Sequence, residues 1–425
     1  MKLNTKYLRY LASEDWRVLT AVEMGSKNHE VVPTSLIIQL SNLRGSSGVH
    51  KSISTLAKAN LIARTKNAKY DGYRLTYGGL DYLALHTHLK RDAIYSLGPC
   101  IGTGKESDIY VCAPPPSNTS NSQKFHKNNQ LVLKIHRLGR ISFRTVKNNR
   151  DYLRRRQSAS WMYMSRLAAQ REFAIMSILG ENGFRVPEAV AWTRHMVVMS
   201  LVDGVPLRAV KEVGNPAGLY ADLIQIILQL ASFGIIHGDF NEFNIILQEE
   251  QLASQTKKTP ELEVRAVPWI IDFPQAISID HANAEFYFNR DVQCIKTYFE
   301  RRFNFLSSEA GPFFADARKA AAKQATAKGK RLDLEVEASG FSKKKVQELV
   351  QYMEDVGANQ DQGSYADDVQ DESDDNSEDG TGEGDQDLIQ DDPVIIGDPP
   401  NIASNGLEDD AIYSITPLKA SIAKD

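Results

Sequence analysis

The chain has 425 residues, a net charge of -4 and a mean hydropathy of -0.36. Hydrophobic residues at 42% and charged residues at 24% are typical of a folded globular protein, which excludes a chain that is mainly membrane-embedded or wholly disordered. The three cysteines, Cys100, Cys112 and Cys294, are too few and too far apart for a four-ligand zinc site or a secreted disulfide framework, so we expect a reducing intracellular compartment.

Charge is distributed unevenly along the chain. Between Glu354 and Asp392 there are 16 acidic residues and no Lys or Arg, so residues 1–353 carry a net charge of about +15. A basic body with an acidic tail suits a protein that meets a polyanion, although such tails also serve only as solvated segments. We expect residues 354–425 to be disordered because they have too little apolar surface to offset the entropy of ordering.

Two segments bear on membranes. Residues 1–13 lack the apolar stretch of a signal peptide. The most apolar run, residues 223–236, is interrupted by polar residues and is shorter than the roughly 20 residues that cross a bilayer. We interpret this run as a buried helix and expect no membrane partner.

The N-terminal region has the pattern of a winged helix. Apolar residues at helical spacing predict three helices, over residues 14–24, 33–40 and 49–57. A hairpin-like stretch follows at residues 62–76, and a linking helix is expected over residues 80–91. The third helix would be the recognition helix, with Lys66, Lys69 and Arg74 on the wing. Nucleic-acid binding is one interpretation of this domain, and protein docking is the other.

A segment with two glycines, Ile101 to Val111, lies between short strand-like runs. It is not a Walker loop, because Glu106 follows Lys105 where Ser or Thr should bind magnesium, and Ser107 replaces the third glycine of a dinucleotide fingerprint. A kinase-type glycine loop remains, and it requires a lysine in the following strand. Lys134, in the apolar run 131–135, is a candidate for this phosphate-binding lysine. The alternative is that Lys134 is a surface lysine on an edge strand.

Further kinase-like features follow in the expected order. Glu172 lies in a helical pattern and can pair with Lys134, and residues 237–247 place Asp239 and Asn244 at the Asp-x4-Asn spacing of a catalytic loop. An apolar strand then ends at Asp272, where kinases place the carboxylate that chelates magnesium across the phosphates. The combination predicts a magnesium-dependent ATP site.

Three departures from ordinary protein kinases are informative. Gly238 replaces the arginine before the catalytic aspartate, and Pro274 replaces the glycine that follows Asp272-Phe273. The chain also has no Ala-Pro-Glu segment before a helix expected near residues 289–299. We therefore expect the activation loop and the peptide-docking lobe to be missing.

The motifs resemble the RIO family of atypical protein kinases, and the winged helix matches its second subfamily. The resemblance rests on residues 104–108, 134–139, 237–244 and 271–275. It implies an α+β fold with a bilobal kinase-like core, preceded by a winged helix over residues 1–92. The core would consist of an N-lobe over residues 93–202 and a C-lobe without activation loop over residues 203–310. A helical extension over residues 311–353 and a disordered acidic tail over residues 354–425 would follow.

The resemblance also implies roles for single residues. Asp239 would be the catalytic base, and Asn244 and Asp272 would bind Mg2+; in this subfamily the metal-binding aspartate can itself accept phosphate, which makes Asp272 a candidate aspartyl-phosphate. The predicted ATP-binding residues are Lys105, Glu106, Ser107, Lys134, Glu172, Met199, Ser200 and Val202. Relatives usually carry glutamate where Ser200 stands, but adenine would bond to the main chain there.

The implied activity is ATP hydrolysis or serine phosphorylation during late cytoplasmic maturation of the small ribosomal subunit, with turnover driving release from the precursor. The implied partners are precursor rRNA and ribosomal proteins, together with assembly factors and an export receptor at the C-terminal region of a protein that shuttles through the nucleus. The alternatives are a nucleotide-sensing pseudoenzyme scaffold and a protein kinase that phosphorylates a substrate in trans.

The basic segment 137–161 and the apolar segment 346–353 each allow two interpretations. Residues 137–161 correspond to the family's flexible loop, and their eight basic residues, Arg137 among them, predict contacts with rRNA or else a solvated basic loop. The apolar spacing in residues 346–353 predicts either a nuclear-export signal or a helix that folds back on the kinase.

Overall fold

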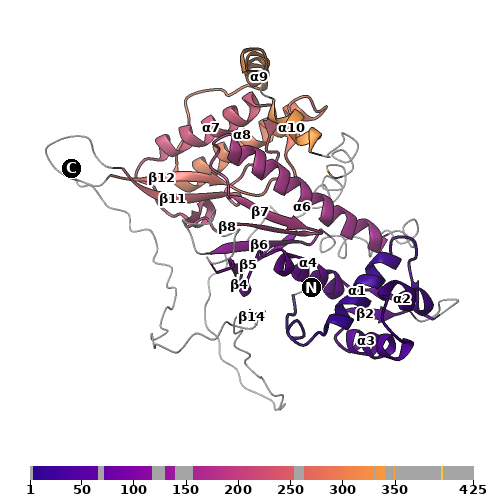
Figure 1. Cartoon of the computed structure of the whole chain (residues 1–425). Helices are drawn as coiled ribbons and strands as arrows, with labels where there is room; N and C mark the ends of the chain where they lie inside the picture. The colour runs from indigo at the N-terminus through magenta and orange to yellow at the C-terminus, as the bar shows by residue number, and fades with distance from the viewer. Residues whose placement is uncertain are drawn as a thin grey trace, which may run out of the picture.

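The computed structural model describes residues 3–65, 71–116, 130–138, 157–252, 263–328 and 331–339, together with Leu349 and Val394–Ile395. Lys66 and Lys69 of the predicted wing lie outside these residues, as do residues 139–156 of the basic loop and nearly all of the acidic tail. A central sheet has the N-terminal helices at one end and the C-lobe helices at the other (Figure 1). No helix within the described ranges has the length and hydropathy needed to cross a membrane.

The N-terminal elements form the predicted winged helix. They are α1 (Ser13–Gly25), β1 (Val32–Pro33), α2 (Thr34–Ser41), α3 (Ser46–Lys58), β2 (Ile62–Arg64) and β3 (Gly72–Leu75). The sheet has the order β1-β3-β2, one strand more than the predicted hairpin, because Val32 pairs with Tyr73. Val18, Ile37 and Ile53 bring the three helices together in one apolar core.

The N-lobe is built on an antiparallel sheet with the strand order β14-β4-β5-β6-β8-β7. Helix α4 (Tyr77–Lys90) is the predicted linking helix at the end of the N-terminal domain. The N-lobe elements are β4 (Ser96–Thr103), β5 (Ser107–Ala113), β6 (Leu131–His136), α6 (Gln157–Glu181), β7 (Ala189–Thr193), β8 (Met196–Ser200) and β14 (Val394–Ile395). Helix α6, which carries Glu172, runs along the sheet in Figure 1 and begins at Gln157. Residues 157–161 therefore belong to this helix and not to the predicted flexible loop.

Strand β6 is buried on both faces, and its side chains alternate between two cores. Leu133 and Ile135 join the core of the winged helix, whereas Val132 joins the core shared with α6 and the C-lobe. Because successive strand residues point to opposite faces, Lys134 lies on the α6 face and Arg137 emerges on the α4 face. The winged helix and the N-lobe thus share one apolar core.

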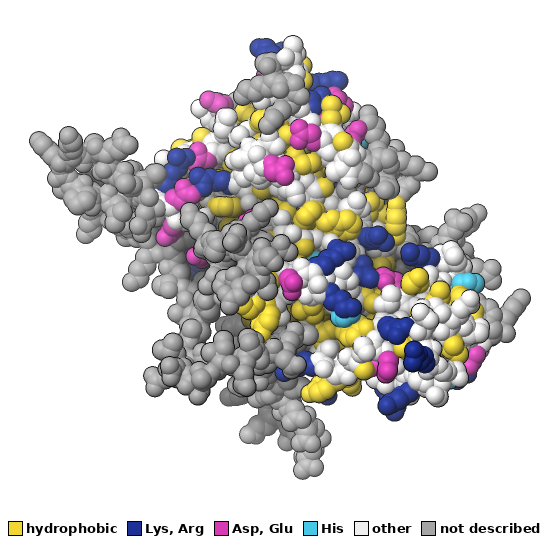
Figure 2. All heavy atoms as spheres, in the orientation of Figure 1, with side chains coloured by type: hydrophobic (Ala, Val, Ile, Leu, Met, Phe, Trp, Pro, Cys, Tyr) yellow, Lys and Arg dark blue, Asp and Glu magenta, His cyan; other side chains and the backbone are white. Residues whose placement is uncertain are grey.

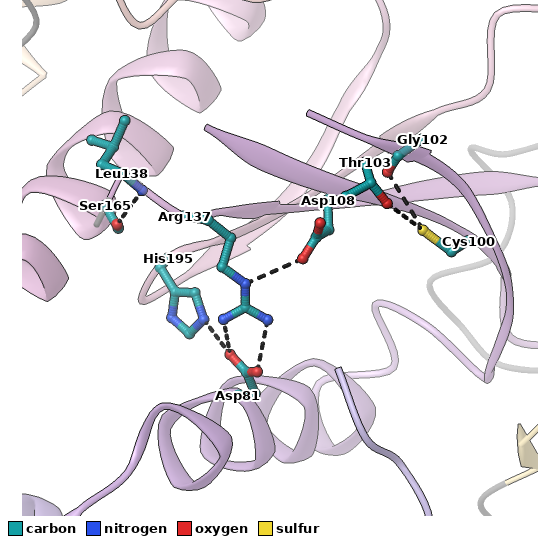
Figure 3. A network of polar contacts seen from close by, with 9 residues as sticks. All are labelled: Asp81, Cys100, Gly102, Thr103, Asp108, Arg137, Leu138, Ser165 and His195. Atoms are coloured by element: carbon teal, nitrogen blue, oxygen red, sulfur yellow. Dashed lines mark hydrogen bonds and ion pairs between the residues drawn. The ribbon is translucent and has the colours of Figure 1, made fainter. Parts of the chain in front are cut away.

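Arg137 is a buried structural residue, which corrects its assignment to an exposed RNA-binding loop. Its guanidinium donates to both carboxylate oxygens of Asp81 on α4, at 2.7 and 2.8 Å, and its Nε lies 3.3 Å from Asp108 on β5 (Figure 3). His195, between β7 and β8, contacts Asp81 at 2.7 Å. Burial opposes charge on Asp81, but His195 and Arg137 outweigh it and lower the pKa of the carboxyl.

The C-lobe packs around α7, which covers residues 223–232 of the apolar run predicted as a buried helix. The run ends differently from the prediction, because Ile235–Ile236 form a short strand. The C-lobe elements are β9 (Val205–Pro206), η2 (Leu207–Ala209), α7 (Pro216–Ser232), β10 (Ile235–Ile236), β11 (Ile245–Leu252), β12 (Glu263–Ile270), β13 (Ile277–Ser278), α8 (Ala284–Phe303), α9 (Phe314–Lys328) and α10 (Leu332–Ala338). Only β13 and short connections separate Asp272 from α8, so the activation loop is missing as predicted.

Beyond α8, helix α9 matches the predicted helical extension, and α10 is an addition to it. Arg331 holds α10 in place through Asp280, at 2.7 Å, and through Asp333. Residues 346–353, which have the apolar spacing noted above, lie outside the described residues except for Leu349, which is buried with Leu138 and Leu167. This contact fits the interpretation that the segment folds back on the kinase.

The Asp81 cluster makes a prediction about stability. Asp81→Ala leaves the buried guanidinium of Arg137 with only the 3.3 Å contact to Asp108, so we expect the free energy of unfolding to fall by about 3–5 kcal/mol in urea titrations. The control is Asp71→Ala, which breaks an exposed pair with Arg64 and should cost less than about 1 kcal/mol. Equal costs for the two variants would contradict a buried anchor.

Candidate active site

Lys134 is the centre of the site and is almost completely buried. Its Nζ lies 2.6 Å from Glu172 Oε1 on α6 and 2.8 Å from Asp272 Oδ1 at the end of the β12 segment. Burial disfavours the ammonium, but the charges of Asp272 and Glu172 outweigh burial and raise the pKa of Lys134. The lysine is therefore a fixed positive charge, and the edge-strand alternative is wrong.

His136 holds the second oxygen of the same glutamate. It lies two residues after Lys134 on β6, so both side chains face α6, and its Nε2 is 2.8 Å from Glu172 Oε2. Both side chains are buried, at 2% and 1% exposure. Burial opposes charge on Glu172, but Lys134 and His136 outweigh it and lower its pKa. Glu172 is thus oriented through both oxygens, which fixes the carboxylate that positions Lys134.

The catalytic loop brings Asp239 and Asn244 together. Asn244 Nδ2 donates to Asp239 Oδ2 and to the Asp239 main-chain oxygen, both at 2.9 Å. His237 accepts from the Asp239 N–H through Nδ1, at 3.3 Å, and its Nε2 lies 3.3 Å from the Ile271 oxygen. Burial lowers the pKa of His237 to about 4, so a neutral ring links the catalytic loop to the segment that carries Asp272.

Helix α8 supports this loop from the C-lobe. Asp291 accepts hydrogen bonds from the N–H groups of Gly238 and Phe240 at 2.8 and 2.9 Å, and Arg290 donates to the Gly238 oxygen. Gly238 has φ +77°, and a Cβ there would lie 2.8 Å from the Gln275 oxygen. The arginine of ordinary kinases is therefore excluded at this position, and a guanidinium reaches the loop from α8.

Asp272 has a left-handed backbone conformation, with φ +70°. Non-glycine residues with this conformation store strain that the surrounding structure must offset, and such residues cluster at functional sites. The Ile271 N–H donates to the Asn244 oxygen at 3.0 Å, so the chain just before Asp272 is tied to the catalytic loop. This geometry leaves the Asp272 side chain 38% exposed while it contacts Lys134.

Three carboxyl groups give the site excess negative charge. Burial and the nearby charges of Asp272 and Asp239 raise the pKa of Glu106 to about 7, and burial and Asp272 raise the pKa of Asp239. Within the described part of the chain, no three His, Cys, Asp or Glu residues converge as a ready-made metal cage. The donors fit Mg2+, which typically binds one or two protein ligands and completes its shell with phosphate oxygens and water. Asp272 and Asn244, the predicted ligands, would hold it.

The remaining predicted residues line the approach to this centre. Gly104 N–H donates to the Ser107 oxygen at 2.8 Å and closes the glycine loop, on which Lys105 is exposed and Glu106 half-buried. Met199 is buried in β8 and Val202 follows that strand. The Ser200 N–H donates to the Glu188 oxygen at 3.0 Å, and Ser200 Oγ accepts from the Glu188 N–H at 2.9 Å. The main-chain N–H of Ser200 is therefore already bonded to Glu188 and is not free to bond adenine. The adenine contacts of Met199, Ser200 and Val202 stay predictions.

Sequence reasoning missed several residues that support the site. Strand alternation from Lys134 could have identified His136, because residues i and i+2 share a face. Asp291 and Arg290 carry no such signal, since they reach the loop from a helix more than 50 residues later. His237 begins the catalytic-loop motif, but its bond to the Ile271 oxygen depends on tertiary structure.

Comparison with known proteins agrees with this geometry. A family model described as "Rio2, N-terminal" matches residues 8–91, and one described as "RIO domain" matches residues 109–254 and 262–310. A serine/threonine-protein kinase rio2 from Schizosaccharomyces pombe is 49% identical over 355 residues, which cover 84% of this chain and 93% of that protein. The chain belongs to the Rio2 family of RIO kinases. It is therefore an atypical serine/threonine kinase.

Other Rio2 proteins extend the match. Serine/threonine-protein kinase RIO2 from Saccharomyces cerevisiae is 45% identical over 402 residues, which cover 91% of this chain and 87% of that protein. A Rio2 kinase from Chaetomium thermophilum, solved as an ADP/Mg2+-phosphoaspartate complex, is 59% identical, covers 84% of this chain and 100% of its own, and has a TM-score of 0.74. ATP and Mg2+ are accordingly the cofactors of this kinase.

The His136–Glu172 bond makes a testable prediction. His136→Leu removes a buried bond to a charged group, worth about 1.5–3 kcal/mol, so we expect ATP turnover at saturating Mg2+ to fall about tenfold or more. His136→Gln keeps a donor near the same place and should retain most of the activity. Thermal unfolding of both variants separates this effect from loss of fold. Equal turnover in the two variants would contradict an orienting role.

Proposed function

We propose that the kinase hydrolyses ATP through an aspartyl-phosphate on Asp272 and that this turnover releases it from precursors of the small ribosomal subunit in the cytoplasm. The observation that carries the first part is the geometry of Asp272. Its carboxylate is partly exposed, lies on a strained backbone and is held from one side by Lys134. The Chaetomium thermophilum Rio2 kinase, which is 59% identical, holds a phosphoaspartate in its complex with ADP and Mg2+, and this supports the same assignment.

The proposed chemistry has two steps. In the first, an Asp272 carboxylate oxygen attacks the γ-phosphorus of ATP, the bond to the β-phosphate oxygen breaks, and ADP leaves. In the second, water attacks the acyl phosphate, inorganic phosphate leaves, and the Asp272 carboxylate is regenerated. Asp239, whose raised pKa suits proton transfer, takes the proton from the water. Bound Mg2+ would neutralise charge on the phosphates, and Lys134 would hold their oxygens.

Two structural features favour turnover as a switch over phosphorylation of a peptide. The short path from Asp272 to α8 leaves no activation loop on which a peptide substrate could dock. The winged helix shares a buried core and the Asp81–Arg137 cluster with the N-lobe, so a surface that binds RNA would be rigidly joined to the phosphate site. The basic body suits an RNA-rich partner. Assembly factors, an export receptor and nuclear shuttling stay predictions.

The aspartyl-phosphate predicts a specific labelling pattern. With γ-32P-ATP and Mg2+ the protein should acquire label that hydroxylamine removes, and Asp272→Asn should abolish the label. Asp239→Ala should reduce turnover about 10²- to 10⁴-fold through loss of the base. Glu285→Gln is the matched control, since this exposed carboxylate lies in the first turn of α8 and should leave turnover unchanged.

Different outcomes would support the rival functions. Label that persists in Asp272→Asn, or only acid-stable phosphoserine on an added protein, would contradict the proposed intermediate and favour phosphorylation in trans. Turnover that is unchanged by Asp239→Ala would contradict the catalytic assignment of the loop and favour a nucleotide-sensing scaffold.

A further inference from the structure

We propose that a groove between α1, the end of α2 and α4 binds a segment of single-stranded RNA. This inference rests on the RNA-containing partner of the proposed function and adds a contact surface to it. The groove has a volume of about 810 Å3 and lies where the winged helix meets the N-lobe. Its walls include Trp16, Arg17, Met24, His86, Lys90 and Arg194.

The charge of the groove is complementary to a polyanion. No acidic residue among those described lines it, whereas Arg17 and Lys90 are both exposed on its walls. Neither of them has a carboxylate partner among the residues that the structure describes, and Arg17 is steadied at the rim by donation to the Asn42 oxygen. Lys and Arg side chains gather on the face in view near this junction (Figure 2). Two positions suited to phosphate contacts therefore flank the groove.

The second feature of the groove is a flat aromatic pair. The rings of Trp16 and His86 stack with centroids 3.9 Å apart and an interplanar angle of 1°, and both side chains are half-buried. Burial, with the nearby charges of Lys90 and Arg194, lowers the pKa of His86 to about 4, so the stack is uncharged at neutral pH. Met24, at 49% exposure, adds apolar surface. Aromatic platforms between cations are how proteins bind unpaired bases.

This surface is distinct from the recognition helix of the winged helix. Lys51 and Lys58 lie exposed on α3 and do not line the groove. Arg194 is not available to phosphate, because it donates to Glu23 at 2.6 and 2.7 Å and to the Leu83 oxygen at 3.0 Å. These bonds instead join α1, α4 and the β7–β8 turn, so the groove walls are held in a fixed arrangement.

A salt titration with the full chain tests the charges. Binding of fluorescein-labelled decauridylate is followed by anisotropy for the wild type and for Arg17→Gln with Lys90→Gln. Each lost phosphate contact lowers the slope of log K against log salt by about 0.7 for single strands, so the double variant should lose about 1.4. The matched control, Lys51→Gln with Lys58→Gln on α3, should leave the slope unchanged.

The aromatic pair gives a second readout. His86→Ala should weaken binding of the oligonucleotide about fivefold or more without changing the salt slope, and His50→Ala on α3 should have no effect. Equal losses from the groove pair and the α3 pair, or displacement of the RNA by an equal concentration of a glutamate decamer, would overturn the proposal. ATP turnover is measured on the same variants and should stay at the wild-type rate. If the wild-type protein turns over ATP but does not bind the RNA, the groove proposal is refuted and the proposed function is not. If it binds the RNA but does not turn over ATP, the proposed function is refuted and the groove proposal is not.

Discussion

A lysine ammonium buried between two carboxylates is the interaction on which this site depends. An unpaired charge at the position of Lys134 would be strongly destabilising, and removal of either carboxylate would leave the other groups uncompensated. Glu172 holds the ammonium from α6, and Asp272 holds it from the far side of the site. The two ion pairs of Lys134 therefore bring together the N-lobe sheet, helix α6 and the segment that carries Asp272. ATP phosphates can take the place of Asp272 on the lysine without uncovering its charge.

Strand β6 extends this constraint to the winged helix. Its alternation sends Lys134 and His136 toward α6 and Leu133 and Ile135 toward the N-terminal core, and Arg137 continues the second face into the Asp81 cluster. His136 also donates its main-chain N–H to the His195 oxygen, at 2.9 Å, and His195 contacts Asp81. An unbroken series of buried polar contacts thus joins α4 to the site, and the proposed RNA contacts would be coupled to ATP turnover through it.

The sequence predicts those site residues that belong to short motifs. It does not predict residues whose role depends on a partner far away in the chain. Lys134, Asp239, Asn244 and Asp272 each lie beside an apolar run, so local spacing was enough to assign them to one pocket. Arg137 continues into a basic run, and only its partner Asp81, 56 residues away, determines that it is buried. Asp291 likewise supports the catalytic loop from a later helix, and α10 is held by charges on Asp280 and Asp333 that no periodicity reveals.

The most direct test of the central claim is a crystal structure of this chain with Mg2+ and a non-hydrolysable ATP analogue. We predict that Lys134 Nζ keeps Glu172, leaves Asp272 and lies about 2.7–3.2 Å from a phosphate oxygen. Asp272 and Asn244 should each place an oxygen about 2.0–2.1 Å from the metal. A lysine that remains on Asp272 while nucleotide binds elsewhere, or a metal held by neither residue, would contradict the central role of this lysine.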